Sequence, residues 1–240
     1  MRYTLAELPF SLGTVRDFYA FEQHVRAARA RRGLGVPPEW YALPVFYFCA
    51  PPIYGHDDVI PPPSYTAELD YELEIAAIIG REGVNIPVSE AESYIFGYTV
   101  MNDWSARDVQ RVEMAVGLGP AKAKDFALSL GPVVVTPDEL AAYRFKKGYA
   151  LRMSARRNGV TLSLGLWADI HWSFAEMIAR ASQANPLKAG DVIGSGTVGT
   201  GCILELGPES VGGWLQPGDV VELDIEGIGT LRNVIGAKGD

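Results

Sequence analysis

The sequence predicts a strand-rich α+β domain, and three observations support this. The chain has 240 residues, of which 48% are hydrophobic and 21% charged, so a sizeable buried core is expected. From Ala150 onward, short segments with strand patterning alternate with turn signals such as Arg157–Gly159. No internal repeat or low-complexity linker divides the chain. We therefore expect a single domain over residues 1–240.

Helical periodicity and stop signals predict three helices. They cover Thr14–Arg32 (ended by Gly33), Trp104–Val116 and, approximately, Ser173–Ala184. Prolines punctuate residues 37–63, which favours extended segments and loops there. Strands are expected over Tyr71–Ile79 and Phe96–Met101, after Gly131 up to Val135, and over Asp219–Ile235 with Gly227 and Gly229 between two strands.

The charge balance excludes some partners. Lys and Arg total 21 against 29 Asp and Glu, which gives a formal charge of −8. Such a chain is a poor binder of nucleic acid or of an anionic membrane surface, so neither partner is expected.

The N-terminus lacks the features of a signal peptide, and no apolar stretch is long enough to cross a membrane. With Cys49 and Cys202 interpreted as free thiols, a cytoplasmic location is expected. An anionic substrate would then need local basic side chains or a bound cation.

The predicted strand Tyr71–Ile79 carries two carboxylates near its start. Alternate side chains of a strand share a face, so Glu72 and Glu74 should point the same way. The apolar residues that follow suggest a strand covered on both sides. Two carboxylates at the edge of a core repel each other unless a cation neutralises them, and Mg²⁺ or Ca²⁺ would suit their oxygens. A strand end with solvated glutamates is an equally good interpretation of this spacing.

Asp103 stands where a strand is expected to pass into a helix. It could cap that helix, with Arg107 and Gln110 on the same helical side. A solvated cap with an ion pair is the simpler interpretation when this segment is considered alone.

Asp17 and His24 are seven residues apart, which would place them on one stripe of the first predicted helix. They could then reach one site, the aspartate as a metal ligand and the histidine as a base. The alternative is a capping box at residues 14–17 and a surface histidine among arginines. From these residues alone, the second interpretation is favoured.

Two glycine-rich loops cover residues 117–126 and 194–201. Neither has the pattern of a phosphate-binding loop, although backbone N–H groups in such loops can hold a carboxylate. As isolated features, both are typical of plain turns.

Together these segments resemble the fumarylacetoacetate hydrolase family, in order and over nearly the whole chain. The family's long MNDWSARD signature is matched letter for letter by Met101–Asp108. The other matching elements are Asp17–Tyr19 with His24, Trp40–Tyr47, Glu72–Glu74, the Lys124 loop, Ser195–Thr197 and Leu204–Leu206.

This resemblance implies a mixed β-sandwich roll with flanking helices, usually paired as a homodimer. It implies that Asp17, Glu72, Glu74 and Asp103 bind one Mg²⁺ or Ca²⁺ ion. It also implies that His24 and Glu205 activate water, and that Lys124 helps stabilise the oxyanion. The implied substrate contacts are Tyr47, Arg107, Gln110, Lys124 and Thr197.

The implied activity is metal-dependent hydrolysis of a carbon–carbon bond in a small anionic β-diketo acid such as fumarylacetoacetate. Alternatives are an acylpyruvate hydrolase, a 2-oxo acid decarboxylase or isomerase, and a non-catalytic dicarboxylate-binding protein. The SH3-like N-terminal domain of known fumarylacetoacetases is not expected, since the resemblance begins at Asp17. Met114 replaces an aromatic residue of the family's W-E-Y element. The arginines before Gly33 offer a further substrate contact, without indicating which arginine provides it.

Overall fold

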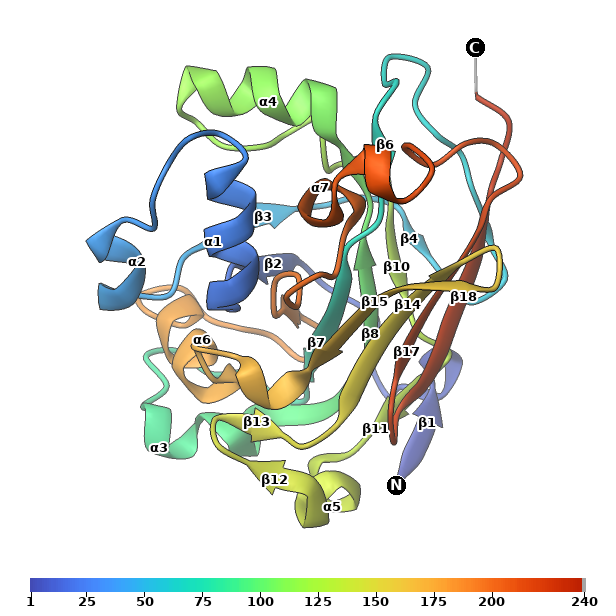
Figure 1. Cartoon of the computed structure of the whole chain (residues 1–240). Helices are drawn as coiled ribbons and strands as arrows, with labels where there is room; N and C mark the ends of the chain where they lie inside the picture. Colours follow the sequence, from blue (N-terminus) through green and yellow to red (C-terminus); the bar gives the residue numbers. More distant parts are fainter. Residues whose placement is uncertain (239–240) are drawn as a thin grey trace.

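Two β-sheets, packed face to face, form the framework of the molecule in the computed structural model (Figure 1). The structure describes residues 1–238, apart from the side chain of Cys49. Strand β14 of the smaller sheet contacts β7 of the larger one, while β17 and β18 contact β8. One buried apolar cluster contains residues of both sheets, for example Ile75 and Leu223. The core of the molecule therefore lies between the sheets.

The larger sheet has nine strands. In spatial order its main path is β1 (Arg2–Thr4), β11 (Val133–Val135), β8 (Ile95–Asp103), β7 (Leu73–Ile79), β16 (Val192–Gly194), β2 (Val15–Phe18) and β3 (Phe46–Cys49), and β10 (Leu128–Leu130) joins β8 to β4 (Ile53–Tyr54). The smaller sheet runs β15 (Val160–Leu166), β14 (Arg152–Arg157), β17 (Val220–Ile225), β18 (Gly229–Ile235) and β5 (Val59–Ile60). Two short pairs complete the strands: β12 (Arg144–Phe145) with β13 (Gly148–Tyr149), and β6 (Leu69–Asp70) with β9 (Ser105–Ala106).

The helices are short and lie around the sheets. They are α1 (Glu22–Ala30), α2 (Pro38–Ala42), α3 (Val88–Ala91), α4 (Arg107–Val116), α5 (Pro137–Leu140), α6 (Phe174–Ala181) and α7 (Ile203–Leu206). Single 3₁₀ turns occur at Leu5–Glu7, Glu92–Tyr94, Ala141–Tyr143, Trp167–Asp169 and Pro208–Ser210. The predicted strand-rich α+β class is thus confirmed. In the described part of the chain, no helix is long and apolar enough to span a membrane.

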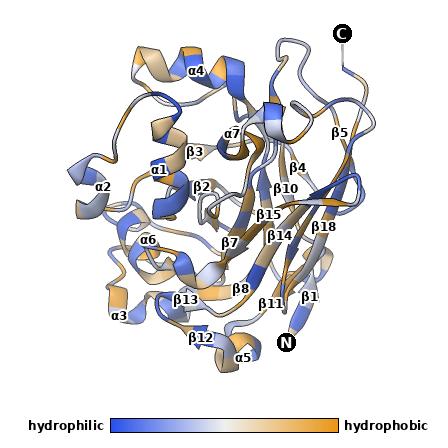
Figure 2. Cartoon of the chain, in the orientation of Figure 1, coloured by the Kyte–Doolittle hydropathy of each residue, from blue (hydrophilic) through white to orange (hydrophobic). Residues whose placement is uncertain are grey.

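Strand β7 is covered on both faces, as its sequence suggested. Leu73 and Ile75 belong to the main core, whereas Ala76 packs on the other face with Met101 and Leu130. Figure 2 shows the apolar character of this strand at the centre of the molecule. The predicted strand is correct from Leu73 onward. Its two glutamates are buried, so the interpretation of a strand end facing water is wrong.

The helix predicted over Thr14–Arg32 is wrong in its first part. Val15–Phe18 forms β2, which runs parallel to β16 and antiparallel to β3. All four residues are buried, so their apolar spacing cannot distinguish a strand from a helix. The helix α1 begins only at Glu22 and ends at Ala30. The capping-box interpretation of residues 14–17 is therefore also wrong, and Asp17 and His24 do not share a helical stripe.

The helix predicted from Trp104 begins instead at Arg107. Trp104 is fully buried, and its Nε1 donates to Ser129 Oγ at 2.8 Å. The next two residues form β9, and Ala106 occupies the N-cap position of α4. Asp103 is therefore the last residue of β8, and its interpretation as a helix cap is wrong.

Other predicted boundaries shift by a few residues. The strand predicted at Phe96–Met101 extends over Ile95–Asp103, and the one predicted after Gly131 is Val133–Val135. The third predicted helix is α6, which begins at Phe174 and ends at Ala181. Its N-cap residue is Ser173, whose Oγ accepts from the Glu176 amide at 3.2 Å. Cys202 is a buried free thiol, whereas the side chain of Cys49 lies outside the described residues.

Candidate active site

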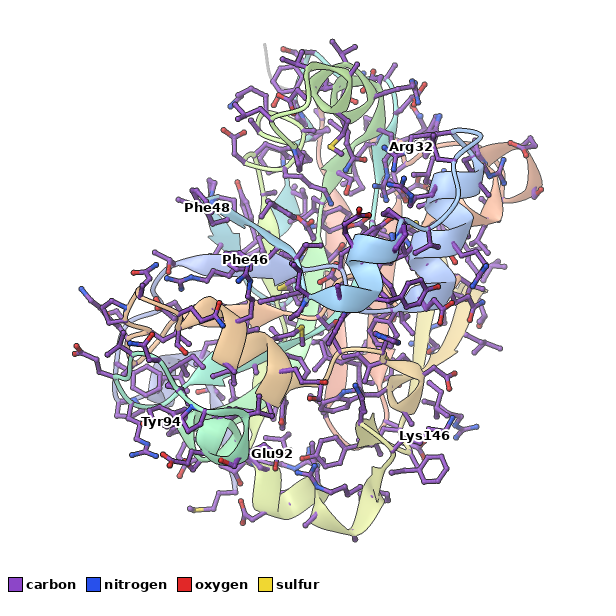
Figure 3. All side chains as sticks on the ribbon, turned by 90° about the vertical axis from the view of Figure 1, so that its left-hand side faces the viewer. Arg32, Phe46, Phe48, Glu92, Tyr94 and Lys146 are labelled. Carbon is purple, nitrogen blue, oxygen red and sulfur yellow. The ribbon has the colours of Figure 1, made fainter. Side chains whose placement is uncertain are left out.

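A pocket of about 450 Å³ opens beside the end of the larger sheet, between α1, α4 and β3. Arg32 and Phe46, labelled in Figure 3, both line it. Nine of the eleven residues predicted to form the site line this pocket: Asp17, His24, Tyr47, Glu72, Glu74, Arg107, Gln110, Lys124 and Thr197. The other two, Asp103 and Glu205, bond to residues that line it.

Four carboxylates meet at the inner end of the pocket. The side chains of Asp17, Glu72, Glu74 and Asp103 each offer an oxygen, and these four oxygens lie within 4.8 Å of one another. All four residues are at most 5% exposed. Segments that are far apart in the sequence are thus brought together around one point.

The order of the strands explains this convergence. Asp103 ends β8, Glu74 lies on β7 beside it, and Asp17 lies on β2 beyond β16. On β16, Gly194 is opposite Asp17 and has no side chain to separate the acids. A Cβ atom at this position would lie 2.3 Å from Asp17 Oδ1, so glycine is required for the carboxylate to occupy its place.

Burial and mutual repulsion disfavour the charged form of most of this cluster. Burial raises the pKa of Glu74 well above its usual range, and the nearby Asp17 charge raises it further. Burial likewise raises the pKa of Asp17 well above its usual value, together with the charge of Asp103. The pKa of Asp103 is also raised by burial, although Lys124 opposes that shift. A cation bound among these carboxylates would therefore strongly stabilise their charged forms.

Glu72 behaves differently because two cations contact it. Burial acts to raise its pKa, but the charges of Lys124 and Arg107 outweigh burial and lower that pKa. Lys124 Nζ donates to Glu72 Oε2 and to Ser105 Oγ, both at 2.6 Å, and also to Asp103. Arg107 Nη2 donates to Glu72 Oε1 at 2.7 Å. The buried acids and bases thus form one connected network.

The donor set of the cluster fits a hard divalent cation. All of its donors are carboxylate oxygens, which Mg²⁺ and Ca²⁺ prefer. Two of these buried oxygens, Glu74 Oε1 and Asp103 Oδ1, have no hydrogen-bond partner. Buried polar atoms are normally satisfied, and ligation of a cation would satisfy both of them.

His24 and Glu205 form a buried pair. His24 Nδ1 lies 2.9 Å from Glu205 Oε2, and the two side chains are 5% and 4% exposed. His24 comes from α1 and Glu205 from α7, two helices that contact each other. With Nδ1 held by the carboxylate, Nε2 is the ring nitrogen that remains to exchange a proton. The interpretation of His24 as a surface residue is wrong.

The other predicted site residues occupy consistent positions. Gln110 Oε1 accepts from Arg107 Nη1 at 2.9 Å, which leaves its amide N–H groups as donors. The Tyr47 hydroxyl donates to Asp103. Thr197 lies in the glycine-rich loop after β16 and is 2% exposed.

Several pocket residues were not predicted individually from the sequence. They include Tyr19 and Phe46 of the pocket wall, and Arg29, Arg31, Arg32 and Arg111 near its rim. Burial raises the pKa of Tyr19 to about 12, so this phenol stays neutral. The arginine run before Gly33 was the available signal for three of the rim cations. Met114, which replaces an aromatic residue of the family pattern, also lines the pocket.

Gly196 connects the second glycine-rich loop to the acid cluster. Its amide donates to Asp17 Oδ1 at 3.2 Å and to Glu74 Oε2 at 3.0 Å. Gly196 has φ +76°, and a Cβ atom there would lie 2.5 Å from the carbonyl oxygen of Phe18. The loop therefore holds carboxylates of the protein itself, a role that a plain turn would not require.

We expect Gly196→Ala to be considerably more destabilising than Gly218→Ala. Gly218 also has a positive φ, of +91°, but nothing lies within 4 Å of the position of its Cβ. The control thus measures backbone strain alone, about 1–3 kcal/mol, while Gly196→Ala adds a clash with backbone. Thermal unfolding of both variants is the measurement. Equal losses of stability would contradict the proposed close packing.

A strand-rich sandwich with clustered buried carboxylates and a carboxylate-bound imidazole in one pocket has the architecture of an enzyme that acts on small molecules. Comparison with known proteins narrows this class. The model of the fumarylacetoacetate (FAA) hydrolase C-terminal domain matches residues 13–236. The chain belongs to the fumarylacetoacetate hydrolase family.

Individual relatives cover several activities. The chain is 33% identical over 191 residues to oxaloacetate tautomerase YisK of Bacillus subtilis, covering 77% of this chain and 58% of that protein. It is 30% identical over 250 residues to the fumarylacetoacetase of Oryza sativa subsp. japonica, covering 83% and 58%. The chain thus spans about three-fifths of the length of these relatives. The solved structure of fumarylacetoacetate hydrolase from Exiguobacterium antarcticum superposes with a TM-score of 0.73 at 29% identity, covering 98% of this chain and 78% of that one.

Proposed function

We propose that this protein is a divalent-metal-dependent hydrolase that cleaves a carbon–carbon bond in a small anionic β-diketo acid such as fumarylacetoacetate. The carrying observation is the buried His24–Glu205 pair in the same pocket as four clustered carboxylates. In this proposal Asp17, Glu72, Glu74 and Asp103 hold one Mg²⁺ or Ca²⁺ ion. The bound ion would act as a Lewis acid toward the substrate oxygens.

His24 would be the general base. Its Nε2 takes a proton from water while Glu205 orients the ring and stabilises its charged form. The water oxygen bonds to a carbonyl carbon of the substrate, and the resulting oxyanion collapses to a carboxylic acid as the C–C bond breaks. The electron pair of that bond passes into the enolate of the departing fragment. The imidazolium then returns its proton to the carbon, so one water molecule is consumed.

Lys124, Arg107 and Gln110 would stabilise negative charge on the substrate. Lys124 and Arg107 are each at most 3% exposed and are held by carboxylates, so their donors are preorganised. Each well-placed donor to an oxyanion contributes about 3–4 kcal/mol to lowering the barrier. Tyr47 and Thr197 would complete the substrate contacts proposed for this pocket wall.

The rim arginines favour an anionic substrate over a neutral one. Arg29, Arg31, Arg32 and Arg111 line the pocket although the whole chain has a formal charge of −8. Arg31 is paired with Glu209, and Arg111 with Glu68, whereas the Arg32 side chain forms no ion pair with any described residue. A local positive field of this kind attracts and orients a carboxylate-bearing ligand.

The test is turnover of a substrate panel by the purified protein. Fumarylacetoacetate, an acylpyruvate and oxaloacetate would each be assayed with Mg²⁺, Mn²⁺ or Ca²⁺, and with a chelator. We expect metal-dependent loss of diketone absorbance and release of two acids from a diketo acid. Undiminished cleavage in chelator would refute the metal's role. Binding without turnover of any substrate would instead favour a dicarboxylate-binding protein.

The second candidate is a decarboxylase, isomerase or tautomerase of 2-oxo acids. The 33% identity to an oxaloacetate tautomerase favours it, since the same carboxylates and base could support proton transfer alone. Turnover of oxaloacetate without hydrolysis of any diketone would support this alternative. Nuclear magnetic resonance of the products separates enol–keto exchange from loss of carbon dioxide.

We also propose that two copies of the chain form a homodimer. The edge strand β3 pairs only with β2 among the described residues, and Phe48 on it is 80% exposed. Figure 3 shows Phe48 pointing away from the sheet. An exposed apolar edge of this kind is normally covered by a partner. We expect Phe48→Glu to sediment as a monomer and the unmodified protein as a dimer, while a monomeric unmodified protein would exclude the assembly.

A further inference from the structure

We propose that Asp70 is a positioning residue, which aligns Arg107 and the helix that carries Glu205 with respect to each other. Its catalytic consequence rests on the proposed function, whereas its geometric role does not. Asp70 ends β6 and is fully buried. It is neither among the clustered carboxylates nor among the pocket-lining residues. Any effect of Asp70 on the site must therefore pass through its neighbours.

The Asp70 carboxylate accepts four hydrogen bonds. Its Oδ1 accepts from the amides of Tyr71 and Ile203, both at 2.8 Å. Its Oδ2 accepts from Arg107 Nε at 2.8 Å and from the Leu204 amide at 3.0 Å. One side chain thus joins three segments that are distant in the sequence, and all of its partners are N–H donors.

The bonds to Ile203 and Leu204 fix the start of α7. This helix has only four residues, so it is too short to be stable by itself. Its N-cap residue, Cys202, provides no side-chain cap. Asp70 performs that task from another segment by accepting from two first-turn amides. Glu205 is the third residue of the same helix, so the direction of its carboxylate toward His24 depends on this anchor.

The hydrogen bond from Arg107 to Asp70 fixes the orientation of the Arg107 guanidinium. The guanidinium of Arg107 donates through Nε to Asp70, through Nη2 to Glu72 and through Nη1 to Gln110. The Nε contact determines how the planar group is rotated, because its remaining donors have a fixed geometry relative to Nε. Asp70 therefore sets the relative placement of the proposed substrate donor and the proposed base pair.

The sharpest variant is Asp70→Asn, which keeps the shape of the side chain. Asparagine offers only one acceptor oxygen. Its NH₂ group would face N–H donors and could not accept hydrogen bonds from them. Part of the anchor is lost, either toward α7 or toward Arg107. Loss of an outer-shell group behind the ligands of a metal site typically costs about 10- to 100-fold in metal affinity or activity, and for Asp70 we expect the loss in kcat. Mn²⁺ affinity measured by calorimetry should stay close to that of the unmodified protein.

Asp219→Asn is the matched control. Asp219 is 8% exposed and accepts from Arg157 Nη2 at 2.6 Å, from Asn158 Nδ2 at 2.7 Å and from the Gln216 amide at 2.7 Å. It does not line the pocket. We expect this variant to lower the melting temperature without changing kcat. A purely structural role of Asp70 would give the same result in both variants.

Two further measurements decide the proposal independently of substrate identity. The His24 Nδ1 proton, bound to a carboxylate, should give a downfield resonance that Asp70→Asn weakens or shifts and Asp219→Asn leaves in place. In the unmodified protein, the Ile203 and Leu204 amides should exchange slowly with solvent, which remains measurable even if Asp70→Asn fails to fold. Rapid exchange of both amides, or an unchanged His24 resonance in folded Asp70→Asn, would overturn the proposal.

With an active substrate, a double-mutant cycle tests the route of coupling. If Asp70 acts through Glu205, the losses in kcat for Asp70→Asn and Glu205→Gln should combine to less than their product. Independent, multiplicative losses would show that Asp70 does not act through Glu205. Absence of turnover in the unmodified protein would count against the proposed function and leave the resonance and exchange tests valid.

Discussion

His24→Ala should lower kcat by about 10²- to 10⁴-fold, the usual contribution of a general base. The reason is that His24 carries the only imidazole among the described residues that line the pocket, with Nδ1 held by Glu205 at 2.9 Å. Its side chain lies beside the carboxylate cluster and is not one of its members. Calorimetric titration with Mn²⁺ should therefore give nearly the same dissociation constant for the variant and the unmodified protein.

His56→Ala is the control for this prediction. His56 lies near the start of β5, outside the pocket, and its Nδ1 accepts from the Arg232 amide at 3.2 Å. We expect its kcat to match that of the unmodified protein. The kcat of Glu205→Gln should lie between those of His24→Ala and His56→Ala. Glutamine can still accept from the His24 Nδ1–H, but it no longer stabilises the charged ring. A nearly normal kcat for His24→Ala would show that another group serves as base.

Glu74→Gln should change thermal stability in opposite directions with and without metal. In chelator we expect its melting temperature to exceed that of the unmodified protein, because burial and Asp17 both penalise the Glu74 charge. A gain of ~1 kcal/mol corresponds to about 2–4 °C in a domain of this size. With saturating Mg²⁺ or Mn²⁺, the variant should bind the ion more weakly, lose activity and melt below the unmodified protein, because it lacks one carboxylate ligand.

The pH dependence in chelator follows from the same shifts. The folded-state pKa values of Glu74 and Asp17 lie above their unfolded values, so the stability linked to their protonation is complete below the unfolded pKa. It is lost as pH rises through the folded pKa. Glu72 has a lowered pKa and acts oppositely, with a contribution that is lost as pH falls. Glu74→Gln should therefore flatten the decline in stability on the alkaline side.

The control here is Glu222→Gln on β17, where the partner is Arg156 at 3.2 Å on the neighbouring strand. This partly exposed pair should contribute at most about 1 kcal/mol, equally in metal and in chelator. Identical melting curves for Glu74→Gln and the unmodified protein in chelator at every pH would contradict the electrostatic account. Unchanged metal affinity in the variant would remove Glu74 from the proposed ligand set.

Local sequence signals predicted the elements that have one exposed and one buried face. The paired strands near the C-terminus, β17 and β18, alternate buried and half-buried residues and were predicted with their turn. Helix α6 has a buried face and a Ser173 cap, and it was predicted to within a few residues. The same signals failed at Val15–Phe18, where every residue is buried. Periodicity alone cannot assign a segment that is buried on both faces, although β7, which is also buried throughout, was predicted correctly as a strand.

At the site, too, some features were predicted from the sequence and others were missed. The resemblance of the Met101–Asp108 run to a family signature identified Asp103 and Arg107, but the neighbouring residues alone favoured a solvated helix cap. In the structure Asp103 ends a strand and is fully buried beside Lys124. Asp70 was missed, although it stands only two residues before Glu72, because its partners Arg107, Ile203 and Leu204 are not its neighbours in sequence.

By itself the sequence determined the chemical inventory: the acids, the imidazole, the basic side chains and the family to which they belong. Only the tertiary structure decided which of these groups meet. Their convergence depends on the strand order β8–β7–β16–β2 and on Gly194, which has no side chain to displace the Asp17 carboxylate. It also depends on the contact between α7 and α1, which brings Glu205 to His24. The physical reason is that hydrogen bonding and desolvation act between groups adjacent in space, and chain folding sets that adjacency independently of separation in sequence.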